Sequence, residues 1–248
     1  MSTTTSTPQT PSTLTDATVL VIGGTKNLGY AIAERAAARG AHVVIGGRDL
    51  NEAKQAATRL GTARAIAIDV TDETSIAAAA AELGAVDHVI TTAAAHHNVP
   101  ITDLEHDKIV TAFEAKVIGP MLLAKHFGSI MPATGSIILF SGVAAWKPAD
   151  GYSVMGITNG AASFAAQHLA KELAPLRVNA ISPGIIDSGT WDAMPADDRA
   201  AFFDGVAEGN LAGRVGAITD IVDAAEWLLT AGFVSGETIH VEGGARSA

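Results

Sequence analysis

Short apolar runs rich in Val and Ile recur along this chain of 248 residues, and longer stretches with helical periodicity separate them. Nearly every position of these runs is apolar, which is typical of strands that are buried on both faces. Such strands form a parallel sheet between two layers of helices. The chain is therefore predicted to be α/β, with one Rossmann-like, doubly wound domain of about seven strands. The predicted strands are 17–22, 42–46, 64–68, 86–91, 136–140, 176–181 and 238–241.

Two segments depart from this alternation. Residues 1–15 are rich in Ser, Thr and Pro and carry almost no charge, so we expect a disordered tail before a domain that spans residues 16–248. Residues 188–214 break the strand–helix order, and we expect them to form a lid over a substrate. Trp191 and two phenylalanines of the lid favour an apolar small-molecule substrate, although they can equally serve only to seal the lid helices.

The composition excludes several functions. The net charge of −10 repels phosphate backbones, so no nucleic acid is expected as a partner. The absence of cysteine excludes disulfides, thiolate metal sites and a cysteine nucleophile. No apolar run approaches the ~20 residues that a membrane helix needs, and residues 1–15 lack the apolar core of a secretory signal. We therefore expect a cytoplasmic protein that binds no membrane.

The strongest binding motif is a glycine-containing turn directly after the first predicted strand. Residues 23–29 connect that strand to a helix. Glycines let the backbone turn tightly and approach a pyrophosphate, and the helix N-terminus offers free N–H groups and a partial positive charge. An ordinary tight turn between a strand and a helix is the alternative. The residues of this turn predicted to contact a dinucleotide are Gly23, Thr25, Lys26, Asn27, Leu28 and Gly29.

The end of the second predicted strand bears on the choice of nucleotide. An NAD-binding protein usually places a carboxylate here to bind the ribose 2′-hydroxyl. This chain has Gly47 at that position, and Arg48 follows it. A guanidinium suits a 2′-phosphate, and Lys26 is a second cation directed at the same place, so NADP(H) is predicted as the cofactor. The alternative is that both cations are solvated surface charges.

From about residue 17 onward the chain resembles the short-chain dehydrogenase/reductase (SDR) family. The family's turn, T-G-x-x-x-G-x-G, has Ile22 here in place of Thr and Asn27 in place of the middle Gly. Asparagine tolerates a left-handed backbone better than most residues, so the turn can still form. The family's N-N-A-G segment after the fourth strand is T-T-A-A at residues 91–94, and we expect the asparagine hydrogen bonds to be lost.

The resemblance also implies further cofactor contacts and an assembly. Residues 177–184 resemble the family's R-V-N-x-x-x-P-G segment under the nicotinamide. Asp69 resembles an adenine-contacting residue, but it can equally cap a helix. Family members usually form tetramers, and the small residues of 161–174 permit close helix packing, so we expect a homo-oligomer, either a tetramer or a dimer. The implied cofactor positions are Asp69, Val70, Ala93, Asn159, Pro183, Gly184 and Ile186.

The catalytic positions of the main SDR branch are all replaced. That branch uses Asn, Ser, Tyr and Lys, the last two as Tyr-x-x-x-Lys. Alignment on the segment H-L-A-K-E-L-A-P places other residues at these positions: Lys116 at the Asn, Gly142 at the Ser, Met155 at the Tyr and Asn159 at the Lys.

A second branch fits the sequence better. Divergent enoyl-ACP reductases have the pattern Y-x-x-M-x-x-x-K, and Tyr152 with Met155 matches its start. Ser141, eleven residues before Tyr152, also corresponds to a serine of that branch. The match ends at Asn159, where the lysine is expected.

These residues suggest roles in a hydride-transfer reaction. A phenol within hydrogen-bond reach can stabilise the substrate oxygen and supply its proton, so Tyr152 is the candidate acid. Asn159 can bind the nicotinamide ribose but has no charge that makes Tyr152 more acidic, and Lys116 can replace that charge unless it reaches into solvent. Catalytic roles are thus predicted for Tyr152, Ser141, Lys116 and Asn159, and substrate contacts for His96, Met155 and Trp191.

Three functions remain open at this stage. The first is an NADP(H)-dependent oxidoreductase that acts on a carbonyl, an alcohol or a conjugated enoyl group. The second is a catalytically impaired dinucleotide-binding protein with a regulatory or structural role, which the missing lysine favours. Lyase or isomerase chemistry without net redox is the third. The adjacent histidines His96 and His97 are expected to point apart on a loop, so no metal site is predicted.

Overall fold

The computed structural model describes residues 13–61 and 63–248. The predicted tail lies largely outside these residues, but its last three residues are described. Leu14 is 2% exposed and belongs to the hydrophobic core, and Thr15 packs against Gly40. The folded domain therefore begins before residue 16, and the predicted tail boundary is wrong by a few residues. One leucine in a polar segment gives no periodicity from which its burial could be predicted.

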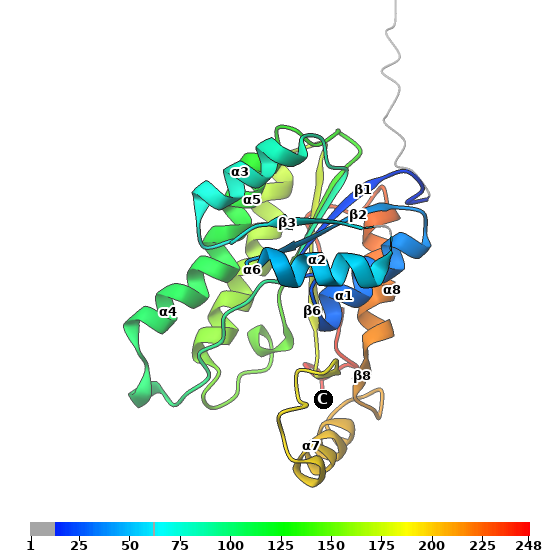
Figure 1. The fold of residues 1–248 in the computed structure, drawn as a ribbon. Coiled ribbons are helices and arrows are strands. Elements are labelled where there is room, and N and C mark those ends of the chain that lie inside the picture. The colour runs from blue at the N-terminus through cyan, green and yellow to red at the C-terminus, as the bar shows by residue number, and fades with distance from the viewer. Residues whose placement is uncertain (1–12, 62) are drawn as a thin grey trace, which may run out of the picture.

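The centre of the molecule is a seven-stranded sheet of parallel strands in the order β3-β2-β1-β4-β5-β6-β9 (Figure 1). Each predicted strand is present within two residues of its expected bounds, which confirms the α/β fold class. The strand order reverses between β1 and β4, where ligands of open α/β sheets usually bind. The strands are β1 Thr18–Ile22, β2 His42–Gly47, β3 Arg64–Ala67, β4 His88–Thr91, β5 Ser136–Phe140, β6 Arg177–Pro183 and β9 Thr238–Val241.

Helices cover both faces of this sheet. One core cluster joins the sheet to α1 (Asn27–Ala38), α2 (Leu50–Leu60) and α8 (Ile218–Thr230). The other cluster joins it to α3 (Glu73–Leu83), α5 (Gly119–Phe127) and α6 (Ser153–Glu172). Alanines form much of the buried helix surface, so the helices lie close to the sheet.

Local signals fix several helix ends. Asp49 caps α2 by accepting hydrogen bonds from the Asn51 and Glu52 N–H groups, and Gly61 ends the helix in the left-handed conformation. Asp72 is the N-cap of α3 and accepts from the Thr74 N–H. The alternative that Asp69 caps this helix is therefore wrong.

The helix that carries Lys116 is interrupted by a wide turn. A five-residue π-helix, η2 (Glu114–Ile118), lies between α4 (His106–Phe113) and α5. The Gly119 N–H donates to the Glu114 carbonyl five residues earlier. Pro120 has no N–H for the Lys116 carbonyl, which disfavours a regular α-helix at this point. The π-turn determines the direction in which Lys116 leaves the helix.

The predicted lid forms a small unit beyond the carboxyl end of the sheet. It contains α7 (Ala196–Glu208), and the short parallel strands β7 (Ile186–Asp187) and β8 (Gly216–Ala217) close its base. Figure 1 shows α7 standing away from the sheet, and no α7 residue is buried. Short 3-10 turns lie at η1 (Ile101–Asp103) and η3 (Val143–Ala145). Within residues 13–61 and 63–248, no helix is long and apolar enough to cross a membrane.

Candidate functional site

The predicted turn has the geometry of an anion-binding backbone. Gly23 has a φ of +81°, and a Cβ placed on Gly29 would lie 2.2 Å from the Gly23 carbonyl oxygen, so no side chain fits there. Helix α1 begins at Asn27, with Lys26 as its N-cap, and the first N–H groups of the helix have no partner within it. Asn27 has a φ of +50°, which confirms that asparagine adopts the left-handed conformation at this position.

Thr92 stabilises the turn from the neighbouring strand end. Its hydroxyl lies 3.2 Å from the Ile22 carbonyl oxygen and 3.4 Å from that of Gly23, and it donates to them. The same oxygen would lie 2.5 Å from a Cβ on Gly23. Thr92 is one of the residues where we expected hydrogen bonds to be lost. The shorter threonine makes its own bonds to the turn, which the sequence alone did not predict.

The end of β2 lacks the carboxylate of an NAD site and packs tightly against the turn. Gly47 is buried, and a Cβ there would lie 3.1 Å from the Thr25 methyl group. Lys26 and Arg48 are both exposed, and neither forms an ion pair with any other described residue. Two free cations thus flank a position without an acid.

Arg59 is a third cation beside the turn, and no sequence motif identified it. Its guanidinium donates to the Thr25 carbonyl at 2.9 Å and lies 5.0 Å from the centre of the Tyr30 ring. Arg59 lies in the last turn of α2, 34 residues from Thr25 in the chain. Only the packing of α2 beside α1 brings them together, so no local pattern could identify this contact.

The positions at the ends of β3 and β4 lie near the same edge of the sheet. Asp69 accepts hydrogen bonds from the Thr71 N–H and hydroxyl at 2.9 and 2.8 Å, and this fixes a turn after β3. Val70 is buried, and its carbonyl oxygen would lie 2.6 Å from a Cβ on Gly119. Ala93 is half-buried, and its N–H donates to the Thr91 hydroxyl at 3.4 Å. Contacts of these residues to a cofactor remain predictions.

Three of the four predicted catalytic residues meet at the end of β5. The Ser141 hydroxyl is buried, donates to the Asn159 carbonyl at 2.8 Å and accepts from the Ser163 hydroxyl at 2.9 Å. The Lys116 ammonium donates to the Ser141 carbonyl at 3.3 Å. Ser141 therefore connects the π-turn to helix α6, and its only proton is used within the protein.

The Asn159 side chain is buried and incompletely bonded. It is 2% exposed, and its Oδ1 has no hydrogen-bond partner. Its Nδ2 would lie 2.7 Å from a Cβ on Gly142, so this glycine provides the space for the amide. A buried acceptor without a partner costs free energy, which is consistent with a site that binds a donor from a ligand.

Lys116 gives this part of the site a positive charge. It is half-buried, and its ammonium donates to the Ser141 carbonyl, which favours the inward orientation over a lysine that reaches solvent. Burial lowers the pKa of Lys116 to about 8, because the charged form is poorly solvated. The pKa of His96 is also lowered, first by burial and then by the charge of Lys116, which places His96 near the ammonium.

Tyr152 lies at the start of α6 and close to the loop after β4. It is half-buried at the N-cap position, and Met155 is half-buried in the first turn of the helix. Gly151 packs against the Val99 backbone, so the loop that carries His96 meets the segment that carries Tyr152. His97 is buried and accepts the Glu105 N–H at 3.0 Å. No metal-binding cluster occurs in the part of the chain that the structure describes.

The lid begins against the nucleotide turn. A Cβ on Gly189 would lie 3.0 Å from the Asn27 side-chain oxygen. The Trp191 ring N–H donates to the Ile186 carbonyl at 3.1 Å, and its ring packs on Phe202 at 4.8 Å, with Phe203 beyond. At the base of the lid, Pro183 pairs with Val241, and the Gly184 N–H donates to the Val241 carbonyl. The aromatic residues therefore seal the lid internally, and a contact with substrate remains a prediction.

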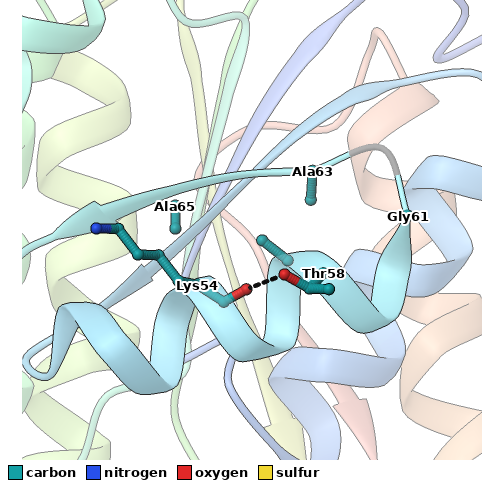
Figure 2. A pocket seen from close by; sticks show the side chains of 6 residues that line it. Lys54, Thr58, Gly61, Ala63 and Ala65 are labelled. Atoms are coloured by element: carbon teal, nitrogen blue, oxygen red, sulfur yellow. Dashed lines mark hydrogen bonds between the residues drawn. The ribbon is translucent and has the colours of Figure 1, made fainter.

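Two surface hollows lie elsewhere, along the edge strand β3. Figure 2 shows the first, of about 500 Å³, between α2 and β3. Three of its six lining residues are alanines, and the Thr58 hydroxyl donates to the Lys54 carbonyl at 2.9 Å beside it. The second, of about 450 Å³, lies between β3 and α3. None of the predicted site residues lines either hollow, so we do not assign the function to them.

Comparisons with known proteins agree with this geometry. Residues 23–246 match the family model described as enoyl-(acyl carrier protein) reductase. A short-chain dehydrogenase/reductase of Acremonium sp. is 29% identical over 247 residues, which cover 91% of this chain and 94% of the relative. A sorbitol dehydrogenase of Cereibacter sphaeroides is 29% identical over 248 residues, with 92% and 96% covered. A solved structure of a small-chain dehydrogenase in complex with NADPH is 31% identical, with a TM-score of 0.82 and coverage of 94% of this chain and 100% of that chain. The chain therefore belongs to the short-chain dehydrogenase/reductase family of oxidoreductases.

Proposed function

We propose that this protein is an NADP(H)-dependent oxidoreductase that acts on the carbonyl, alcohol or conjugated enoyl group of a small molecule, with Tyr152 as its proton donor. The observation that carries the proposal is the turn between β1 and α1, which is open to a pyrophosphate and has the free cations Lys26 and Arg48 beside Gly47. The similarity to a dehydrogenase that was solved with NADPH supports the same cofactor.

The residues present fit this cofactor. The N–H groups at the start of α1 would hold the pyrophosphate, and Lys26 and Arg48 would hold the 2′-phosphate as charge-assisted donors. Arg59 fixes the Thr25 carbonyl and so keeps the turn in shape. When bound, the nicotinamide supplies or accepts the hydride.

Tyr152 is the group we assign to the substrate oxygen. Its phenol can donate a hydrogen bond to that oxygen and then its proton, as negative charge develops there. Lys116 supplies a positive charge that favours this development, and the Asn159 side-chain oxygen offers a free acceptor for a hydroxyl. Because the Ser141 proton is used within the protein, we assign Ser141 to positioning Lys116 and Asn159 rather than to the substrate.

A second candidate is a dinucleotide-binding protein without catalysis, in a regulatory or structural role. The engaged Ser141 hydroxyl and the uncharged Asn159 favour it, since neither can act as the acid or as its activating charge. Both candidates require a bound nucleotide, so turnover of a substrate separates them.

Calorimetric titration with NADPH and NADH tests the proposal. We expect NADPH to bind at about micromolar Kd and NADH at least about tenfold more weakly. Replacing Lys26 and Arg48 by Ala should reduce this preference, whereas Arg64→Ala, an equally exposed arginine on β3, serves as the matched control. If neither nucleotide binds, the oxidoreductase proposal is wrong, and binding of a protein partner becomes the better explanation of the retained fold.

A further inference from the structure

Lys116 has unused hydrogen-bonding capacity. An ammonium has three N–H donors, and only the bond to the Ser141 carbonyl is made within the protein. Burial alone accounts for its lowered pKa, with no contribution from a carboxylate. Among the residues that the structure describes, no acid therefore neutralises this charge, and two donors remain for a ligand.

The ammonium has no counter-ion among the described residues. The Ser141 carbonyl accepts its one hydrogen bond, and the charge of Lys116 contributes to the lowered pKa of the nearby His96 ring. A partly desolvated cation without a counter-ion is costly, and an anion that enters the site recovers that cost. The local charge is thus opposite to the net charge of −10 of the whole chain.

We propose that Lys116 binds the carboxylate of the substrate, and that the substrates of this site are 2-oxo acids and the corresponding 2-hydroxy acids. This inference rests on the proposed oxidoreductase function. A 2-oxo acid presents a carboxylate oxygen and a carbonyl oxygen side by side, which matches the two remaining donors of one ammonium. The same lysine then binds the carboxylate and favours negative charge on the reacting oxygen.

We expect the apolar part of such a substrate to face the lid and the start of α6. The lid carries Trp191, Phe202 and Phe203 as one aromatic cluster, and Met155 is half-buried near Tyr152. An oxo acid with an aromatic or branched side chain would place its carboxylate at Lys116 and its apolar group toward these residues. The carboxylate itself takes no part in the hydride transfer.

Binding of unreactive probes tests the charge recognition without turnover. In calorimetric titrations of the full-length protein, 3-phenylpropanoate should bind at least about tenfold more tightly than 3-phenylpropanamide, its neutral analogue. Lys116→Met should abolish this preference, and Lys108→Met, at an exposed lysine on α4, should retain it. Equal binding of both probes, binding of neither at millimolar concentration, or a preference that survives Lys116→Met would overturn the proposal.

Turnover then separates this inference from the proposed function. The wild-type protein with NADPH should reduce phenylpyruvate at least about tenfold more efficiently, in kcat/KM, than the methyl ketone in which CH₃ replaces the carboxylate. The ratio of the two efficiencies should fall toward one in Lys116→Met. Reduction of the ketone but not of the oxo acid would reject the 2-oxo acid class and leave the oxidoreductase function intact.

Discussion

At the scale of single residues, the proposed chemistry depends on one phenol. Tyr152→Phe removes the proton donor but keeps the ring, so we expect kcat to fall by about 10²–10⁴-fold while the Kd for NADPH changes by less than about twofold. Steady-state kinetics together with calorimetry measure both quantities. Tyr30→Phe is the matched control, because Tyr30 contacts Arg59 through its ring and lies beside the nucleotide turn. A Tyr152→Phe protein as active as the wild type would exclude Tyr152 as the acid.

Gly142 and Asn159 are adapted to one another. Because the Asn159 amide nitrogen would lie 2.7 Å from a Cβ on Gly142, Gly142→Ala must displace a buried amide. We expect a loss of about 1–2 kcal/mol in the free energy of unfolding. In an Asn159→Ala background the same substitution should cost less, since the obstructing group is absent. A double-mutant cycle measured by urea unfolding determines the coupling, and additive costs would mean that the two sites are independent.

At the scale of the elements, β4 and β5 are joined by a buried histidine. His88 pairs in register with Ser136, and its Nδ1 lies 2.8 Å from the Ser136 hydroxyl. Burial lowers the pKa of His88 from 6.5 to about 4. Between these two pH values His88 stays neutral in the folded protein, whereas the unfolded chain takes up a proton. The contribution of neutral His88 to the free energy of unfolding is therefore complete above pH 6.5 and is lost as the pH falls toward about 4.

Urea unfolding at two pH values measures this effect. Between pH 7.5 and pH 5 we expect His88 to account for a loss of about 2 kcal/mol in the free energy of unfolding. His88→Gln should show a correspondingly smaller loss between these pH values, whatever its stability at pH 7.5. His106→Gln, at an exposed histidine on α4, should behave as the wild type. An unchanged pH dependence in His88→Gln would contradict the assignment.

The elements also show how far the sequence alone could lead. Continuous apolar runs identified each strand of the sheet, and the glycine spacing identified the turn, because both patterns are local. The bonds of Thr92 to Ile22 and of Arg59 to Thr25 join residues 70 and 34 positions apart, and only the assembled fold reveals them. The π-turn at Lys116 and the engaged Ser141 hydroxyl were also missed. The first needs the backbone geometry before Pro120, and the second needs the position of Ser163 on α6.

At the scale of the whole molecule, the two helical layers differ in their outer surfaces. In the layer of α5 and α6, large apolar side chains face outward on both the π-turn and the helices. The exposed fractions are 46% for Ile118, 53% for Met121, 60% for Ile157 and 61% for Phe164. Ile157 and Phe164 are seven residues apart on α6 and so share one face of that helix. Monomeric proteins rarely expose such a surface, which supports the expected homo-oligomer through paired helices.

A charge on this surface should therefore separate the subunits. Phe164→Asp places an unpaired carboxylate in any interface that includes α6, and it also removes the apolar contacts of the ring. We therefore expect the dissociation constant of the oligomer to rise by at least about a hundredfold. Sedimentation velocity over a concentration series measures the change, and circular dichroism checks that the fold is retained. Phe233→Asp is the matched control, because Phe233 is fully exposed on the connection between α8 and β9, outside the α5–α6 layer. If Phe233→Asp dissociates the protein and Phe164→Asp does not, the interface lies at the connection between α8 and β9 and does not include Phe164. A wild-type chain that sediments as a monomer would mean that the α5–α6 surface has another partner.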